Sequence, residues 1–93
     1  MSHWYRYSLA ADLSVEEFAA ALTLAYLATE SLHGASQTRL DAAIFVAPAL
    51  KVCVMDASTP VGRDLNRLFV GFLSEVAGTD AFLTQRITLI TAA

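Results

Sequence analysis

Hydrophobic and polar residues repeat along the chain with two different periods, which predict two helices and four strands. Apolar residues recur every three or four positions in residues 15–33 and 60–77, and this spacing is typical of amphipathic helices. The other apolar segments alternate with polar residues or are rich in β-branched and aromatic residues, as strands are: residues 4–10, 39–46, 50–56 and 82–91. The predicted order is therefore strand, helix, strand, strand, helix, strand.

Both helices have recognisable signals at their ends. Ser14 and Glu17 have the spacing of a capping box, in which the serine hydroxyl accepts from the Glu17 amide and the Glu17 carboxylate reaches back to the Ser14 amide. Gly34 is suited to the left-handed conformation that ends the first helix. The second helix is expected to begin with Thr59 as its cap and Pro60 in its first turn.

This order of elements predicts an α+β fold, namely a ferredoxin-like split βαβ sandwich (β-α-β-β-α-β) with a four-stranded antiparallel sheet and both helices on one face. The length of 93 residues fits a single domain, residues 1–93. The two middle strands flank Ala47–Ala49 and are expected to form a hairpin. Gly71, in the middle of the second helix, is interpreted as a point of close packing against the sheet or the first helix.

The second face of such a sheet carries no helices, and it should be polar if it is solvated. Alternation assigns the following residues to the helix side: Leu40, Ala42, Ile44, Val46, Leu50, Val52 and Val54. It assigns these to the open side: Trp4, Arg6, Ser8, Asp41, Ala43, Phe45, Lys51, Cys53 and Met55. Trp4, Phe45, Cys53 and Met55 would then form an apolar patch, and such patches mark association sites.

The composition supports an association site. The chain is 56% hydrophobic and 16% charged, with a mean hydropathy of +0.51, whereas a domain of this size buries only about 60–65% of its unfolded surface. The core face of the first helix is expected to consist of Val15, Phe18, Leu22, Ala25 and Leu32. Its second apolar stripe contains Leu24 and Leu27. We therefore expect a homo-oligomer or a larger protein partner, contacted through Trp4, Leu24, Leu27, Phe45 and Met55.

The charge balance and the absence of long apolar segments narrow the partner classes. A net charge of −3 and a pI near 5.1 argue against a general polyanion binder. Tyr5 and Tyr7 share one face of the first strand, as stacking aromatics do in RNA-binding sheets, so a nucleic-acid-binding module stays a less favoured alternative. The longest uncharged apolar stretch, residues 18–29, is shorter than the roughly 20 residues of a membrane span. With no targeting segment and a single cysteine, we expect a soluble cytoplasmic protein.

One segment before the second helix could bind an anion weakly. Residues 56–64 join a hydrophobic strand to a helix N-terminus, where backbone amides favour negative charge. The candidate donors are Ser58, Thr59, Gly62 and Arg63. No phosphate-binding glycine motif is present. The alternative is purely structural: Thr59 caps the helix, Asp56 bonds the turn amides and Arg63 pairs with Asp64 or a neighbour.

No set of residues forms a catalytic or metal-binding pattern. Cys53 lies in an apolar alternation and has no base nearby in sequence, so we interpret it as an inert small hydrophobe. His33, in the last turn of the first helix, can interact with the helix dipole. His3, His33 and Cys53 are too far apart in sequence for a paired ligand motif, and no metal and no cofactor are expected.

Two main functional hypotheses follow. The first is a small non-enzymatic oligomerising or adaptor domain that acts through protein–protein contacts. The alternative is a dimeric α+β barrel-like ligand-binding protein or enzyme with an apolar pocket, whose polar groups would be Tyr5, Tyr7, His33 and Arg86. A closed pocket with converging polar groups would favour the alternative, and a flat apolar surface would favour the first.

Overall fold

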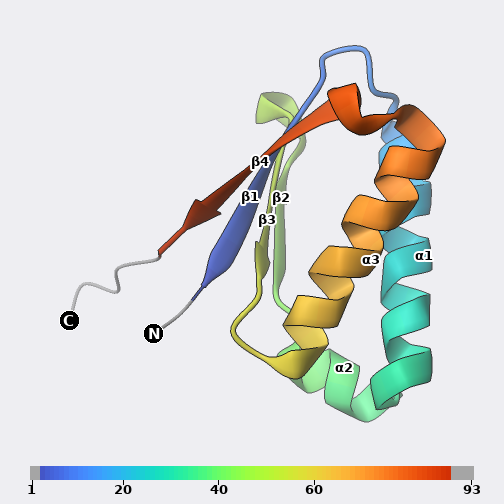
Figure 1. Cartoon of the computed structure of the whole chain (residues 1–93), viewed down its shortest axis with the longest axis vertical. Helices are drawn as coiled ribbons and strands as arrows, with labels where there is room; N and C mark the ends of the chain where they lie inside the picture. Colours follow the sequence, from blue (N-terminus) through green and yellow to red (C-terminus); the bar gives the residue numbers. More distant parts are fainter. Residues whose placement is uncertain (1–2, 89–93) are drawn as a thin grey trace.

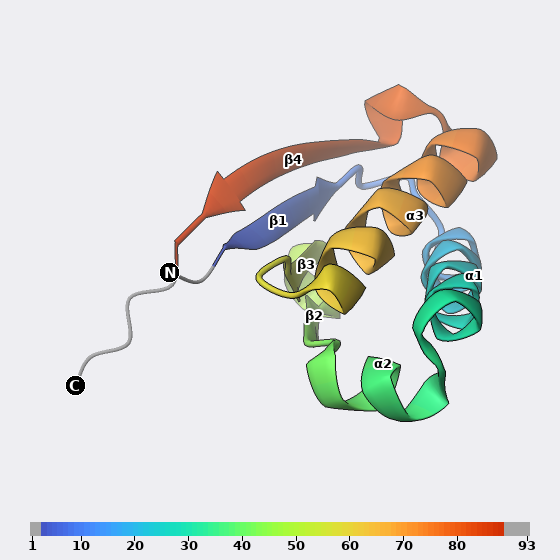
Figure 2. The same cartoon turned by 60° about the horizontal axis from the view of Figure 1, so that its bottom comes forward.

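The computed structural model describes residues 3–88, and these form a sheet with two long helices on one side (Figure 1). The strands are β1 (Trp4–Leu9), β2 (Ile44–Ala47), β3 (Val52–Asp56) and β4 (Phe82–Ile87), and the helices are α1 (Val15–His33), α2 (Ala35–Asp41) and α3 (Pro60–Ala77). The sheet is antiparallel with the strand order β2-β3-β1-β4. Figure 2 shows α1 and α3 together on one face. The fold is ferredoxin-like, as predicted.

The bounds of the long helices agree with the sequence prediction because their caps form. The Ser14 hydroxyl accepts from the Glu17 amide at 3.0 Å, and Thr59 does the same for the Gly62 amide at 2.9 Å. The Glu17 carboxylate differs from the expectation, since it accepts from the Ser14 hydroxyl at 3.0 Å instead of bonding the Ser14 amide. Gly34 ends α1 with a φ of +87°, a conformation that favours glycine.

Ser14→Ala should lower the free energy of unfolding by about 1 kcal/mol, because one amide of the first turn loses its partner. Urea denaturation of the variant and the wild type measures the difference. Ser36→Ala is a matched control, since Ser36 is an exposed residue inside α2 and serves as no helix cap. An equal loss in both variants, or a change in oligomeric state for Ser14→Ala alone, would contradict the capping role.

One predicted strand was partly wrong. Residues 39–41 were expected to begin the second strand, but they end the short helix α2. Its residues are mostly good helix formers, and the Gln37 amide donates to the Asp41 carboxylate one turn later at 2.7 Å. Leu40, expected to face the helices, is exposed. The last strand ends at Ile87, and residues 89–91 of its predicted range lie outside the described residues.

The side-chain orientation predicted for β3 was also wrong, by one residue. The connection from β2 to β3 occupies four residues, 48–51, of which Pro48–Leu50 form a 3-10 turn. The sequence predicted a connection of three residues, Ala47–Ala49. An odd shift in register moves every side chain of a strand to the other face of the sheet. Cys53 and Met55 therefore point at the helices and are fully buried.

The helix-facing side of the sheet is defined by the cross-strand pairs Tyr7–Cys53 and Tyr5–Met55. Ile44 and Val46 pair with Met55 and Cys53 on this side, as expected. In the core the Tyr7 ring packs edge-on against Phe69 of α3 with centroids 5.0 Å apart. This aromatic contact fixes α3 above β1 and so sets one wall of the pocket described below.

The α1–α3 interface uses smaller residues than the sequence predicted. The buried residues of α1 are Ala21, Ala25 and Thr29, one turn apart, and small side chains let two helices approach closely. Val15 and Leu32, expected in the core, are exposed. Gly71 of α3 is also exposed, with no atom within 4 Å of the place of a Cβ, so the close packing expected there is absent.

Candidate functional site

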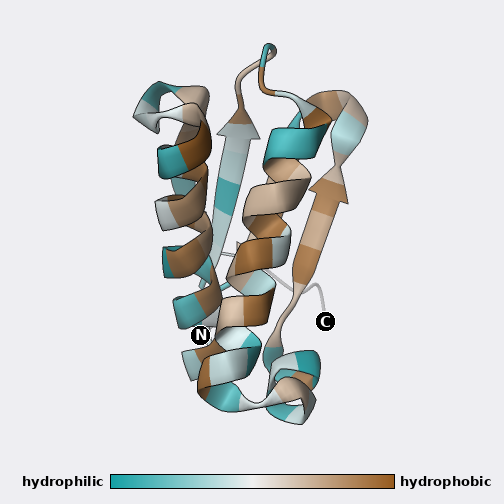
Figure 3. Cartoon of the chain, turned by 90° about the vertical axis from the view of Figure 1, so that its right-hand side faces the viewer, coloured by the Kyte–Doolittle hydropathy of each residue, from teal (hydrophilic) through white to brown (hydrophobic). Residues whose placement is uncertain are grey.

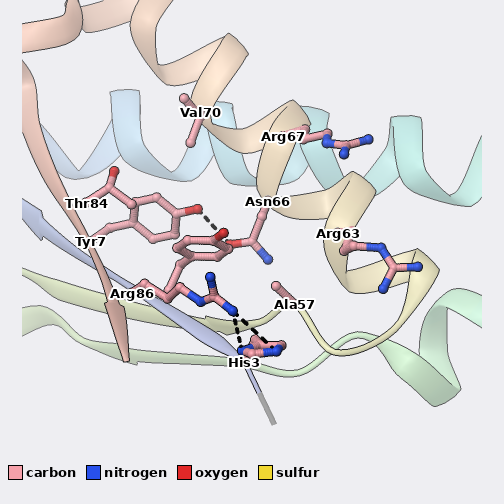
Figure 4. Close-up of a pocket in the computed structure, with 10 residues that line it drawn as sticks. His3, Tyr7, Ala57, Arg63, Asn66, Arg67, Val70, Thr84 and Arg86 are labelled. Atoms are coloured by element: carbon pink, nitrogen blue, oxygen red, sulfur yellow. Dashed lines mark hydrogen bonds between the residues drawn. The ribbon is translucent and has the colours of Figure 1, made fainter. Parts of the chain in front are cut away.

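A pocket of about 480 Å³ opens between α3 and the β1–β4 half of the sheet, and Figure 4 shows its walls. Ten residues line it: His3, Tyr5, Tyr7, Ala57, Arg63, Asn66, Arg67, Val70, Thr84 and Arg86. Arg63, Asn66 and Arg67 come from α3. Tyr5 and Tyr7 come from the helix-facing side of β1, and Thr84 and Arg86 come from that of β4. The volume lies within the range of small-molecule sites.

The basic side chains occupy two walls of this pocket. Arg86 of β4 donates to the His3 ring, with its Nη2 atom 2.8 Å from His3 Nδ1. Arg63 and Arg67 lie on the α3 side, and Figure 4 shows their guanidinium groups directed away from Arg86 and Tyr7. Asp64, expected to pair with Arg63, instead holds His33 Nε2 at 2.7 Å. Arg63 is thereby left facing solvent.

The floor of the pocket is a satisfied polar network. The buried Tyr7 hydroxyl donates to Asn66 Oδ1 at 2.6 Å. The Asn66 amide donates to the carbonyl oxygens of Gly62 at 2.7 Å and Asp56 at 3.1 Å. Burial, and then the neighbouring Cys53 thiol and Tyr5 hydroxyl, raise the pKa of Tyr7 above its usual value. Tyr7 therefore stays protonated at neutral pH and joins β1 to α3.

Three of the four polar groups proposed for a ligand pocket come together. Tyr5, Tyr7 and Arg86 line the cavity, whereas His33 lies outside it and pairs with Asp64. The sequence analysis assigned none of His3, Asn66 and Arg67 to a pocket. A usable signal was present for Arg67, which lies one helical turn after Arg63 on α3 and therefore on the same helix face. Nothing in the sequence pattern indicated that His3 would reach Arg86.

The predicted anion segment is mostly occupied by its own hydrogen bonds. Asp56 accepts from the Ser58 amide at 2.9 Å and from its hydroxyl at 2.6 Å, as the structural alternative expected. The Gly62 amide is taken by the Thr59 hydroxyl. Of the four candidate donors, Arg63 alone lines the pocket. Anion binding by Ser58, Thr59 and Gly62 stays an untested prediction.

Cys53 is fully buried, and burial raises its pKa to about 12. A thiol that stays protonated at neutral pH is a poor nucleophile, which agrees with the interpretation of Cys53 as a small hydrophobe. Within residues 3–88 no three His, Cys, Asp or Glu side chains are grouped as metal ligands.

The opposite side of the sheet is an apolar surface that no described helix covers (Figure 2). Pairing and alternation place these residues on it: Trp4, Arg6, Ser8, Phe45, Ala47, Val52, Val54, Asp56, Leu83, Gln85 and Ile87. We call this set the open face. The Trp4 and Phe45 rings lie 5.7 Å apart, and Phe45 and Leu83 are 63% and 76% exposed.

Two predictions about surfaces change as a result. Met55 was expected to contribute to the interface, but its burial against the helices removes it from the open face. Tyr5 and Tyr7 also point at the helices, so they form no stacking platform for bases on the open face. Leu24 and Leu27 of α1 are about half exposed, and Figure 3 shows hydrophobic residues along α1.

In the part of the chain that the structure describes, no helix combines the length and the apolar character that crossing a membrane requires. Comparison of the chain with protein-family models, curated proteins and solved structures found no match.

Proposed function

We propose that this chain is a self-associating domain that acts through protein–protein contacts, and that a second copy covers its open face. The observation that carries the proposal is the Trp4–Phe45 pair, two aromatic rings in contact on a sheet face without a covering helix. Seven of the eleven open-face residues are apolar, whereas a solvated sheet face is mainly polar. Aromatic residues of this kind are enriched in the centres of protein interfaces.

The charges on the open face favour a second copy over an unrelated partner. The face carries one cation, Arg6, and one anion, Asp56, on the neighbouring strands β1 and β3. A twofold axis brings residue i of one copy to residue j of the other and also the reverse. Two Arg6–Asp56 pairs could therefore form, with Arg6 in the middle of the face between Val54 and Gln85, and Asp56 at the end of β3. The face is self-complementary in charge.

The size of the open face indicates a weak dimer. Four strands about 4.8 Å apart, with about five residues each at about 3.3 Å, make a surface of about 19 by 16 Å. In projection this surface covers about 300 Å², well below the about 800 Å² per partner that a specific interface of standard size buries. We therefore expect a weak dimer that forms at high protein concentration and dissociates on dilution.

Phe45→Glu should abolish dimer formation while the chain stays folded, because an unpaired carboxylate cannot be buried in an apolar interface without a cost of several kcal/mol. Sedimentation velocity over a range of concentrations measures assembly, and circular dichroism checks the fold. Leu27→Glu is the matched control, since Leu27 is similarly exposed but lies on α1, away from the open face.

Two outcomes would contradict the proposal. A wild-type chain that sediments as a 10 kDa monomer at all concentrations has no second copy on its open face, and the surface then serves a different partner. Dissociation by Leu27→Glu but not by Phe45→Glu assigns the interface to α1. A Phe45→Glu chain that unfolds is uninformative about assembly, so Leu83→Lys, at a highly exposed position on β4 of the same face, provides a second test with the same expected loss of dimer.

A further inference from the structure

The pocket between α3 and β4 concentrates positive charge in a chain that is acidic overall. Three of the five arginines line it, and none of its ten lining residues is acidic. The whole chain has a net charge of −3, so the rest of the molecule is considerably more negative than the pocket. Positive and negative side chains are usually interspersed on protein surfaces, and the pocket differs from this pattern by its local excess of cations.

The three guanidinium groups have weak partners or none among the described residues. Arg86 donates to a histidine ring nitrogen rather than to a carboxylate. Arg67 lies 3.9 Å from Asp64, a carboxylate whose other oxygen holds His33 at 2.7 Å. Within residues 3–88 no carboxylate lies within 4.0 Å of Arg63 or Arg86. Arg86 therefore has donors free for a ligand in the pocket, and Arg63 and Arg67 have donors free on the α3 side.

The geometry points to a binding site for a small organic anion, a carboxylate or phosphate ester with a flat apolar body. Arg86 supplies the anchor, because a guanidinium can hold two oxygens of such a group at once. The aromatic ring of Tyr5 and the side chains of Ala57 and Val70 provide apolar walls. Tyr7 and Asn66 satisfy each other and so shape the floor without contributing donors.

Arg86 is held in place for this role by the N-terminal segment. The His3 amide donates to the Ser58 hydroxyl at 3.0 Å, and the His3 carbonyl accepts from the Ala57 amide at 2.7 Å. The backbone of His3 is thus bonded to the turn before α3, and its ring in turn holds Arg86 (Figure 4). Ordering a long side chain before the ligand arrives reduces the entropy lost on binding.

Titration of the ¹⁵N-labelled chain with phenyl phosphate and with benzoate, followed by NMR, tests the inference. We expect at least one probe to shift the amide resonances of β4 and of the first two turns of α3. Arg86→Gln should weaken that binding at least tenfold, and Thr84→Trp, which fills the pocket without removing charge, should do the same. Arg39→Gln is the matched control because Arg39 is an exposed arginine on α2, outside the pocket, and its affinity should stay within twofold of the wild type.

Several results would overturn the inference. They are the absence of binding by both probes, equal weakening by Arg39→Gln, and equal affinity for neutral benzyl alcohol or for inorganic phosphate. If Arg86→Gln does not fold, Arg63→Gln on the exposed side of α3 replaces it, with the same direction expected. All these side chains lie away from the open face, so probe binding and dimer formation can fail independently of each other.

Discussion

Gly62→Ala should lower the free energy of unfolding by about 3 kcal/mol, whereas Gly71→Ala, in the same helix, should raise it by up to about 1 kcal/mol. A Cβ at Gly62 would overlap the backbone carbonyl oxygen of Asp56 and come within 3.2 Å of the Thr59 hydroxyl. Backbone cannot rotate away as a side chain can, so α3 must move, and overpacking of this kind costs about 1–3 kcal/mol. At Gly71 there is open space, and alanine is the better helix former.

Urea denaturation of the two variants tests this opposite pair of effects. The Gly62 change should also disturb the pocket, because the Gly62 carbonyl accepts from Asn66 and Asn66 holds Tyr7. Weaker binding of phenyl phosphate is therefore expected in Gly62→Ala and unchanged binding in Gly71→Ala. Equal stability of both variants would show that α3 does not approach β3 as closely as described.

The fold could be predicted from the sequence because its determinants are local. Ser14 and Thr59 mark the helix starts through bonds to residues three positions away, and such signals need no knowledge of the tertiary structure. The prediction of a strand at residues 39–41 was wrong, since Leu40 and Ala42 fit both an alternating strand and a short helix. The Gln37–Asp41 hydrogen bond and the good helix formers of residues 35–41 favour the helix.

The candidate site could be predicted only in part because its residues meet across long sequence distances. His3 and Arg86 are 83 residues apart, and Tyr7 and Asn66 are 59 apart. Strand alternation places Tyr5 and Tyr7 together, but it does not specify which face the helices cover. The register of β3 determines that Met55 and Cys53 face the helices, and that register depends on one additional residue in the turn at 48–51.

Raising the pH from 8 to 11 should lower the free energy of unfolding by about 4 kcal/mol. Tyr7 and Cys53 face each other across β1 and β3 and are both buried. Burial raises the pKa of Cys53 from 9.0 to about 12 and also raises the pKa of Tyr7 above its usual value of 10.0. Both groups are therefore protonated in the folded chain at pH values where the unfolded chain has released its protons.

The sign of the effect follows from this difference in bound protons. Below about pH 8 both states hold both protons and stability is complete. As the pH rises further, proton release stabilises only the unfolded chain, by about 1.4 kcal/mol per proton and pH unit. A pH of 11 is about two units above the pKa of the unfolded thiol and about one unit above that of the unfolded phenol. At about 1.4 kcal/mol per unit, the two groups together lower the free energy of unfolding by about 4 kcal/mol.

Cys53→Val isolates the contribution of the thiol, since valine is apolar and of similar size. Urea denaturation at pH 8, 9, 10 and 11, under reducing conditions, should show a loss of only about 1–2 kcal/mol in this variant. All other groups titrate alike in both proteins, so the difference in pH dependence belongs to Cys53. If both chains lost stability in parallel, the Cys53 thiol would be accessible to solvent in the folded state, and the register that buries it between β1 and the helices would be wrong.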